Sequence, residues 1–215
     1  MHVEVGLKVL YFGTPVVLVS TRNEDGSANL APISSAWWLD RSAMIGFANA
    51  AQSAANLRRE GECVLNLVPS TLADAVDRLA PLTGAPQVHE RKAAKGYRYE
   101  KDKFGAAGLT EQPSRLVGPP RVRECPIQLE CRLDRAHLFG EDDSATAFEV
   151  AAVAAHVDEE LLVPGTEYVD PVGWDPMIMK FCEYFGHGRP LRRSTLAAFW
   201  RMPHERLRDS LPGPA

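Results

Sequence analysis

Two short apolar runs joined by a turn sequence constrain the fold of this chain more than any other feature. Residues 15–21 read PVVLVST, a β-branched run that is too short for a helix. Residues 23–26 read NEDG, and Gly26 can adopt the positive φ that a tight hairpin turn requires. Residues 28–36 then predict the returning strand. The sequence therefore predicts an antiparallel β-hairpin.

Four further segments have the length and residue types of strands. Residues 43–48 and 63–68 are short apolar runs, and residues 126–133 alternate apolar and polar side chains as a half-buried strand does. Residues 148–157 predict the antiparallel partner of the third of these, with residues 141–144 as the turn between them. Many short strands with few helices favour a mainly β fold over a doubly wound sheet. We expect an antiparallel barrel with a few short peripheral helices.

Two helices are predicted between these strands. Residues 52–60 have helical character, with Ser53 as the expected N-cap and Gly61 as the C-terminal residue. A second helix is expected to begin at Thr71 and to end before Pro81. Its apolar residues recur at helical spacing and should pack inward: Leu72, Val76 and Leu79.

The remaining segments are less regular. Residues 83–122 are rich in Gly, Pro, Lys and Arg, and predict an excursion with one short helix. Residues 191–211 predict an amphipathic terminal helix, whose apolar side chains either pack on the same barrel or dock on another subunit or partner. We expect one domain over 1–195, including the excursion, and a C-terminal helix or tail over 196–215. The apolar residues of the terminal helix are Leu196, Phe199 and Trp200.

Composition excludes several classes of protein. The net charge of −4 comes from interspersed acids and bases, which argues against a nucleic-acid-binding surface. No apolar run reaches membrane-spanning length and no secretory signal is apparent, so we expect a cytoplasmic protein without membrane contact. The four cysteines lack zinc or iron–sulfur spacing, which predicts reduced thiols and no metal site: Cys63, Cys125, Cys131 and Cys182.

Nucleotide and hydrolase motifs are also missing. The chain has no GxGxxG after a strand, no GxxxxGK[ST] and no GxSxG elbow. Phosphate can nevertheless bind at a helix N-terminus, and residues 49–56 (NAAQSAAN) provide one with small side chains around it. The alternative is that Ser53 only caps its helix and Asn56 is its local partner.

The order of the motifs resembles the flavin reductase-like family, which has an FMN-binding split-barrel fold. The resemblance lies in PVVLVSTRNEDGSANLAPISSAWWL, MIGFANAAQSAANLRREGECVLNLV and LADAVDRLA, followed by DKFGAAGL, RECPIQLEC and the stretch from FEVAAVAAHVDEELL to WDPMIMKFCEYFGHG. It covers roughly residues 11–195. It implies an antiparallel split β-barrel of Greek-key type.

The resemblance also implies a set of flavin contacts. The ring-binding strand of the family matches residues 29–35, Trp37 is expected to form part of the wall beside the ring, and the phosphate-binding segment matches residues 49–56. A basic element matches Lys101 and Lys103, for which a solvated charge run is the alternative, and His156 is either a ring-edge contact or a structural histidine. No catalytic side chain is predicted. The expected cofactor-binding residues are Asn29, Ala31, Pro32, Ser34, Ser35, Trp37, Asn49, Ser53, Asn56, Lys101, Lys103 and His156.

The function implied is hydride transfer from NADH or NADPH to FMN, with FAD as a second candidate flavin. A homodimer is expected, with a monooxygenase or another electron acceptor as a partner. Two alternatives remain open at this point: an FMN-binding electron carrier of flavoredoxin type without NAD(P)H turnover, and a flavin-free protein on the same scaffold.

Overall fold

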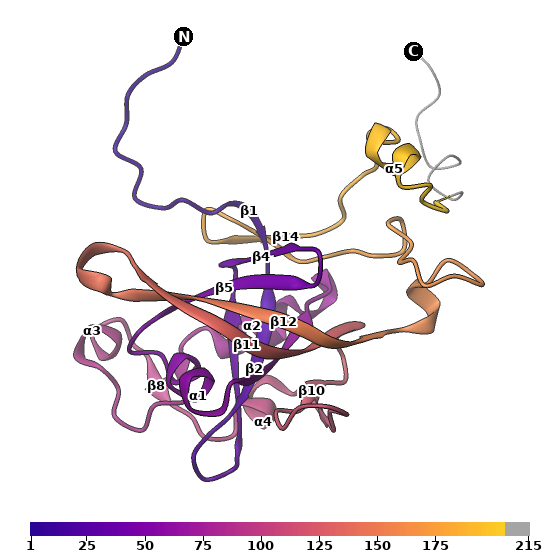
Figure 1. The fold of residues 1–215 in the computed structure, drawn as a ribbon. Coiled ribbons are helices and arrows are strands. Elements are labelled where there is room, and N and C mark those ends of the chain that lie inside the picture. The colour runs from indigo at the N-terminus through magenta and orange to yellow at the C-terminus, as the bar shows by residue number, and fades with distance from the viewer. Residues whose placement is uncertain (205–215) are drawn as a thin grey trace.

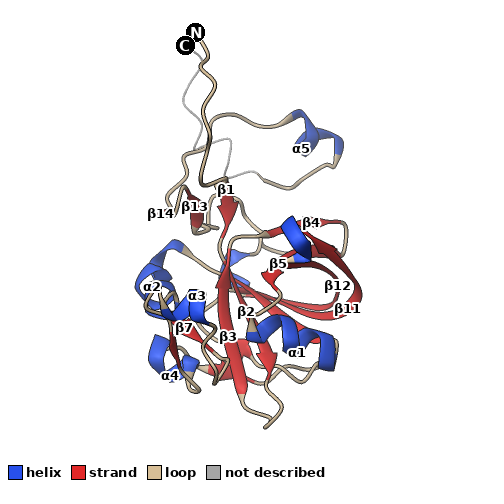
Figure 2. Cartoon of the chain, turned by 90° about the vertical axis from the view of Figure 1, so that its left-hand side faces the viewer, coloured by secondary structure: helices blue, strands red, loops and turns tan. Residues whose placement is uncertain are grey.

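A seven-stranded antiparallel sheet forms the body of the protein, and the computed structural model describes residues 1–204. The strand order is β3-β2-β6-β11-β12-β5-β4, and the sheet curls into the split barrel seen in Figures 1 and 2. The strands are β2 (Val17–Arg22), β3 (Ala28–Ile33), β4 (Ala36–Leu39), β5 (Ser42–Ala48), β6 (Glu62–Leu67), β11 (Ile127–Phe139) and β12 (Ala145–Val157).

The two edge strands of this sheet are consecutive in the chain. β3 ends at Ile33 and β4 begins at Ala36, so Ser34 and Ser35 join one edge directly to the other. The Ser35 carbonyl accepts a hydrogen bond of 2.9 Å from the Gly46 N–H. We name the gap between the two edges, with Ser34 and Ser35 at its end, the seam of the barrel.

Small sheets and helices surround the barrel. β1 (Phe12–Pro15), β13 (Ile178–Lys180) and β14 (Glu183–Phe185) form a three-stranded sheet. Two strand pairs lie in the excursion: β7 (Leu82–Thr83) with β8 (Arg98–Tyr99), and β9 (Glu111–Gln112) with β10 (Arg121–Val122). The helices are α1 (Gln52–Glu60), α2 (Ala73–Leu79), α3 (Glu90–Ala93), α4 (Lys103–Ala107) and α5 (Thr195–Phe199), with 3₁₀ turns η1 (Ser70–Leu72), η2 (Glu141–Asp143) and η3 (Glu159–Leu161).

Two hydrophobic clusters lie on opposite faces of β2. Val17 and Val19 belong to the cluster inside the barrel with Phe148, whereas Leu18 belongs to the cluster beneath α2 and α4 with Phe104. All three β2 side chains are fully buried. A strand buried on both faces needs a continuous apolar run, which is why residues 16–19 read VVLV.

The predicted hairpin is confirmed, and so are the antiparallel β11–β12 pair and the C-terminal role of Gly61. β2 pairs with β3 in register from Val17–Ile33 to Arg22–Ala28, and Gly26 has a φ of 80°. Gly61 ends α1 in the left-handed conformation, with its N–H bonded to the Leu57 carbonyl. The strand predicted over 28–36 is shorter, because the chain leaves β3 at the seam.

Both predicted N-caps are wrong. α1 begins at Gln52, so Ala51 occupies the N-cap position without a side-chain hydrogen bond, and Ser53 lies inside the first turn, where its hydroxyl accepts from Asn29 of β3. Thr71 lies inside η1, and α2 begins two residues later. Val76 and Leu79 are buried as predicted, and Leu72 is partly buried against the same cluster.

The excursion and the terminal segment also differ from expectation. The excursion contains two short helices, α3 and α4, instead of one. Of the helix predicted over 191–211, the described chain shows only α5, and residues 205–211 lie outside the described residues. Leu196, Phe199 and Trp200 are exposed, so of the two alternatives for this segment, packing on its own barrel is wrong for the described part.

Candidate flavin site

Residues 29–38 run from the edge of the barrel across the seam. Asn29 and Ser34 are buried, while the exposed Ser35 donates its hydroxyl hydrogen to the Gly46 carbonyl over 2.8 Å. The two adjacent tryptophans separate as neighbouring strand residues must. Trp37 is 58% exposed, whereas Trp38 packs against the cluster inside the barrel.

A buried network of polar side chains ties the hairpin to α1. The Asn29 side-chain amide donates to the Thr21 hydroxyl over 3.1 Å and to the Ser53 hydroxyl over 3.0 Å. The Asn56 amide donates to Thr21 over 3.0 Å and to the Asn23 carbonyl oxygen over 2.9 Å. Buried polar groups that are mutually bonded hold one arrangement of the chain. The network therefore fixes the start of α1 against the hairpin.

Two polar atoms of this network lack a partner among the described residues, and one of them, the hydrogen of the Ser53 hydroxyl, belongs to a residue that lines a cavity. Ser53 accepts from Asn29, and its own hydroxyl hydrogen has no acceptor among the described residues. The Asn29 Oδ1 atom is buried and has no hydrogen-bond partner in the described chain. It lies against Gly84, where an added Cβ would come within 2.3 Å of it. Gly84 is thus needed for the excursion to approach β3.

A cavity of about 160 Å³ opens beside Ser53, and we name it the lysine pocket. Lys103 from α4 and Lys92 from α3 both line it, together with Thr83 and Gly84 from the excursion. The rest of the wall combines small residues with larger apolar and aromatic ones. The other lining residues are Ala31, Pro32, Phe47, Ala51, Gln52, Ser53, Leu79, Ala80, Leu82 and Tyr97.

The pKa values of both lysines are lowered. Burial, and secondarily the positive charge of Lys92, lowers the pKa of Lys103 to about 8, and Lys103 is only 3% exposed. Burial also lowers the pKa of Lys92, whose Nζ atom lies 5.6 Å from the centroid of the Tyr97 ring. Neither ammonium group has a hydrogen bond or ion pair with any residue in 1–204. Two cations without counter-charge in one pocket indicate a site for an anion.

The start of α1 adds to this anion site. The backbone N–H groups of Gln52 and Ser53 lie in the first turn, where no intrahelical acceptor exists, and the turn contains no acidic residue. The helix dipole favours a negative charge at this end. Together with the two lysines and the Ser53 hydroxyl, the pocket has the donor groups that a phosphate group requires.

The structure brings four of the predicted residues into the lysine pocket: Ala31, Pro32, Ser53 and Lys103. Asn29 lies directly behind Ser53, and Asn56 is held in the buried network behind the pocket wall.

Three predicted residues lie elsewhere. Asn49 accepts hydrogen bonds from Arg58 over 2.7 Å and Thr146 over 2.5 Å at the end of β5. Lys101 is exposed and pairs with Asp25 over 2.7 Å, and His156 contacts Glu130 over 2.6 Å.

Sequence reasoning missed Gln52, Thr83, Gly84, Lys92 and Tyr97. The basic and glycine-rich composition of residues 83–122 was the available signal, but it did not indicate which lysine turns inward. Within residues 1–204, no cluster of three or more His, Cys, Asp or Glu side chains could hold a metal ion, and no helix is long and apolar enough to cross a membrane.

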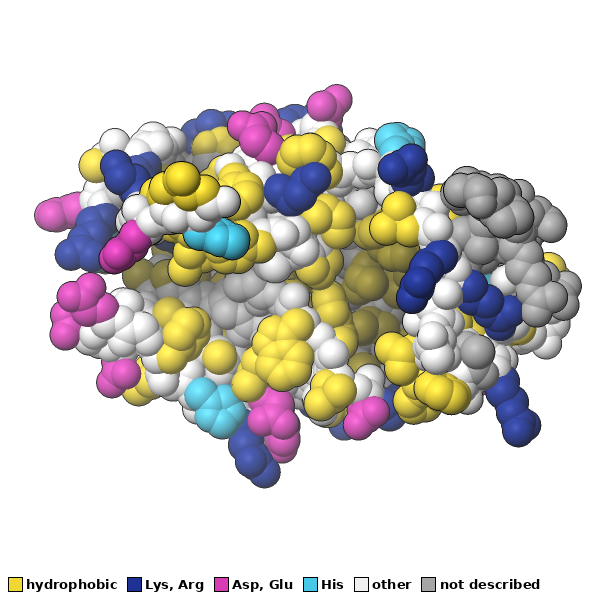
Figure 3. Space-filling view, turned by 90° about the horizontal axis from the view of Figure 1, so that it is seen from above, with side chains coloured by type: hydrophobic (Ala, Val, Ile, Leu, Met, Phe, Trp, Pro, Cys, Tyr) yellow, Lys and Arg dark blue, Asp and Glu magenta, His cyan; other side chains and the backbone are white. Residues whose placement is uncertain are grey.

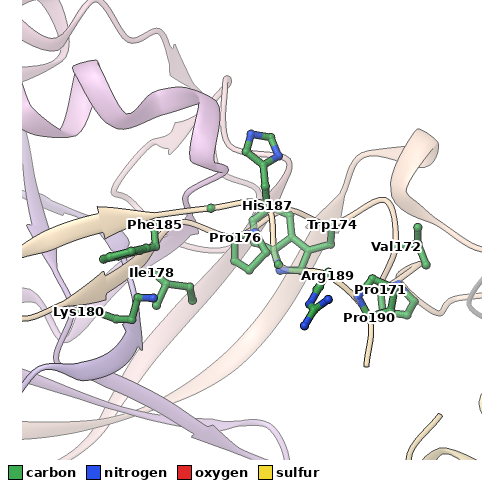
Figure 4. A pocket seen from close by; sticks show the side chains of 12 residues that line it. Pro171, Val172, Trp174, Pro176, Ile178, Lys180, Phe185, His187, Arg189 and Pro190 are labelled. Carbon is green, nitrogen blue, oxygen red and sulfur yellow. The ribbon is translucent and has the colours of Figure 1, made fainter. Parts of the chain in front are cut away.

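A larger groove of about 680 Å³ lies between β13, β14 and the loop before them, and we name it the outer groove (Figure 4). Trp174, Pro176 and Ile178 form its apolar wall, and the Lys180 Nζ atom lies 3.3 Å from the centroid of the Phe185 ring. None of the predicted flavin contacts lines it. We take the smaller lysine pocket as the candidate flavin-phosphate site because its cation Lys103 is buried, whereas Arg189 of the outer groove is exposed and Lys180 lies against the Phe185 ring.

The curled antiparallel sheet with its open seam defines a split-barrel protein. A family model described as "Flavin reductase like domain" matches residues 9–182, and the chain belongs to this family. An uncharacterised protein of Bacillus subtilis (strain 168) is 35% identical over 191 residues, covering 89% of this chain and 92% of that protein. The family places the chain among flavin-related oxidoreductases.

Solved structures share the fold. The flavoredoxin of Desulfovibrio vulgaris (Miyazaki F) superposes with a TM-score of 0.74 at 23% identity, covering 92% of this chain and all of that chain. Component B of nitrilotriacetate monooxygenase from Bacillus cereus gives a TM-score of 0.69 at 22% identity, covering 85% and 88%. These likenesses establish the split-barrel fold predicted from the sequence.

Proposed function

We propose that this protein binds FMN and transfers a hydride from NADH or NADPH to it. The observation that carries the proposal is the lysine pocket, where Lys103 and Lys92 face one cavity without a counter-ion in the described chain. A phosphate monoester carries a charge of about −1.5 to −2 at neutral pH, which matches two ammonium groups. The pyrophosphate of FAD carries a similar total charge but spreads it over two phosphorus centres and brings an adenosine, so a pocket of about 160 Å³ suits the single phosphate of FMN better.

The flavin, when bound, supplies the redox chemistry, and the protein supplies binding, orientation and electrostatics. Ser53, Lys103 and the start of α1 would hold the phosphate. The ring would lie along residues 29–35 at the seam, where β3 is an edge strand of the sheet. In the proposal, Trp37 forms part of the wall next to the ring, and no side chain acts as an acid or base.

Four of the predicted contacts have other roles or positions within this proposal. Asn56 supports the site through Thr21 and Asn23, and Lys101 remains outside the lysine pocket with Asp25 as its partner. Asn49 and His156 would contact a flavin only if it extended beyond the lysine pocket and the seam.

We further propose that the protein is a homodimer. Figure 3 shows hydrophobic side chains gathered on the face seen from above, around a hollow. Large apolar residues of β1, β4 and the β13–β14 hairpin are exposed: Phe12, Trp37, Leu39, Phe181 and Phe185. A contiguous exposed apolar surface is typical of an interface. A second copy would cover this face and the outer groove beside it.

An electron carrier that receives its electrons from another protein is the second candidate, since the fold is shared with a flavoredoxin. If the protein is a reductase, the electrons would pass to a monooxygenase component or to free flavin. The name of the Bacillus cereus neighbour suggests the monooxygenase. The described cysteines are free thiols, which suits a protein that acts in the cytoplasm. We also propose that residues 1–195 form one domain.

The visible spectrum of the purified protein, recorded before and after addition of NADH or NADPH, separates these functions. Bleaching of bound or added FMN at a catalytic rate supports the reductase. A tightly bound flavin that neither nucleotide reduces supports the carrier. A colourless protein that does not quench the fluorescence of added FMN contradicts both and favours a flavin-free role.

A further inference from the structure

A second polar cavity, of about 220 Å³, lies at the start of β11 and the end of β12. Arg121, Arg123, Gln128 and His156 line it, and we name it the arginine pocket. It shares no lining residue with the lysine pocket. Two buried polar side chains on one face of β11, Gln128 and Glu130, hold its functional groups in place.

Glu130 fixes the orientation of His156. The Glu130 side chain is fully buried and accepts backbone hydrogen bonds from Arg115 over 2.8 Å and Leu116 over 2.5 Å. Burial alone would raise the pKa of Glu130, but these bonds and His156 outweigh it and lower the pKa. An ionised carboxylate only accepts, so the His156 Nε2 atom at 2.6 Å carries the hydrogen.

This assignment leaves the other ring nitrogen of His156 for the cavity. The Nδ1 atom has no hydrogen-bond partner among the described residues, and the side chain is 27% exposed. The ring is therefore held by a buried carboxylate on one side and is open to a ligand on the other, an arrangement common to ligand-binding histidines.

Gln128 holds Arg121 in the same way. Gln128 is 5% exposed, and its amide donates to the carbonyls of Val122 over 2.7 Å and Cys125 over 2.9 Å. Its Oε1 atom accepts from Arg121 over 2.9 Å, and the Pro113 carbonyl also accepts from Arg121 over 2.9 Å. The Arg121 guanidinium is thus fixed by neutral acceptors, and its charge is uncompensated.

The charges around the cavity favour an anion. The Arg123 side chain is exposed and has no hydrogen bond or ion pair with another residue in 1–204. The one acidic residue in the lining, Asp158, caps η3 by accepting from the Glu160 N–H over 3.1 Å. Guanidinium groups match the planar geometry of oxyanions and bind them through paired hydrogen bonds.

We propose that the arginine pocket binds a small molecule through an oxyanion, either a carboxylate or a phosphate ester. Arg121 and Arg123 would hold the anionic oxygens, and the His156 ring would lie beside the bound ligand. The site is separate from the flavin site and does not depend on the flavin proposal.

Phenyl phosphate and benzoate test this site, because they share a ring and differ in the anion. Each is titrated into the full-length protein while the imidazole signals of His156, identified by comparison with His156→Gln, are followed by NMR. We expect saturable shifts with at least one probe, and Arg123→Ala should weaken its affinity by about ten-fold or more. The probe that binds distinguishes the phosphate ester from the carboxylate.

Two control variants locate the effect. Arg192→Ala removes the same charge from an exposed position outside the cavity, and Lys103→Ala disables the lysine pocket; both should retain affinity for the probe. The proposal is overturned if neither probe shifts the His156 signals, if Arg123→Ala binds as tightly as the wild type, or if Lys103→Ala abolishes binding. Because Arg123 is exposed and unpartnered, its substitution should leave the thermal midpoint unchanged.

Discussion

Replacing Lys103 with methionine should weaken FMN binding and at the same time stabilise the ligand-free protein. Methionine retains the length of the side chain and removes the buried charge. A hydrogen bond to a charged group contributes about 1.5–3 kcal/mol, so FMN affinity should fall by about ten-fold to a hundred-fold. Riboflavin lacks the phosphate, so its affinity should change little.

The stability effect follows from the lowered pKa of Lys103. A shift from the ordinary value of 10.5 to about 8 corresponds to about 3 kcal/mol of unfavourable free energy when the folded protein holds the charged amine. The cost is complete below pH 8, and it is relieved as the pH rises from about 8 to about 10.5. Lys103→Met should therefore unfold at a higher temperature than the wild type at pH 7, with a smaller gain above pH 10.

Fluorescence quenching of FMN and riboflavin, with thermal unfolding of the flavin-free protein, measures both effects. Lys101→Met is the matched control, because Lys101 is exposed and outside the pocket. The reasoning is refuted if Lys103→Met binds FMN as tightly as the wild type, or if Lys101→Met loses as much affinity. An equal loss for riboflavin would show that the substitution altered the shape of the pocket instead of removing a phosphate contact.

Three further substitutions test the surrounding structure. Asn56→Ala should lower the free energy of unfolding by about 1–3 kcal/mol in a urea titration, because the Asn23 Oδ1 atom loses its Asn56 donor and Thr21 keeps only the bond from Asn29; an unchanged midpoint would contradict this. Gly84→Ala should reduce both thermal stability and FMN affinity, since the added Cβ would lie 2.3 Å from the Asn29 Oδ1 atom. If the variant keeps the wild-type melting temperature and FMN affinity, the excursion can shift to accept the methyl group. The ionised Glu130 should stabilise the wild type at neutral pH, and this stability should be lost as the pH falls through the lowered pKa of Glu130. Glu130→Gln should lack this stability, so equal acid-unfolding profiles of the variant and the wild type would argue against an ionised Glu130.

Local sequence was sufficient for the features that depend on local chemistry. The hairpin around Gly26 and the end of α1 at Gly61 both require a positive φ, and glycine marks each of them. The buried positions Val76 and Leu79 followed from helical spacing. Pairing of β11 with β12 followed from two alternating runs separated by a polar turn, and the structure joins them over their whole length.

The site depends on contacts between distant segments, and there the sequence was less informative. Ser53 has the residue type of an N-cap, but its hydroxyl accepts a hydrogen bond from Asn29, which lies 24 residues earlier in the chain. Lys101 and Lys103 differ by two positions in one charged run, yet only Lys103 turns inward because α4 begins at that residue. Lys92 reaches the same pocket from α3, a placement that no short-range pattern encodes.

The double burial of β2 makes the barrel and the excursion one cooperative unit. Val17 and Val19 anchor the cluster inside the barrel, while Leu18, between them, anchors the cluster that contains Phe104 of α4. Loss of either cluster would expose one face of the same strand, so the two clusters should melt together in a single transition. A ligand that contacts only α3 and α4 would thereby raise the melting temperature of the entire barrel, and hydrogen exchange in β2 would slow when it binds.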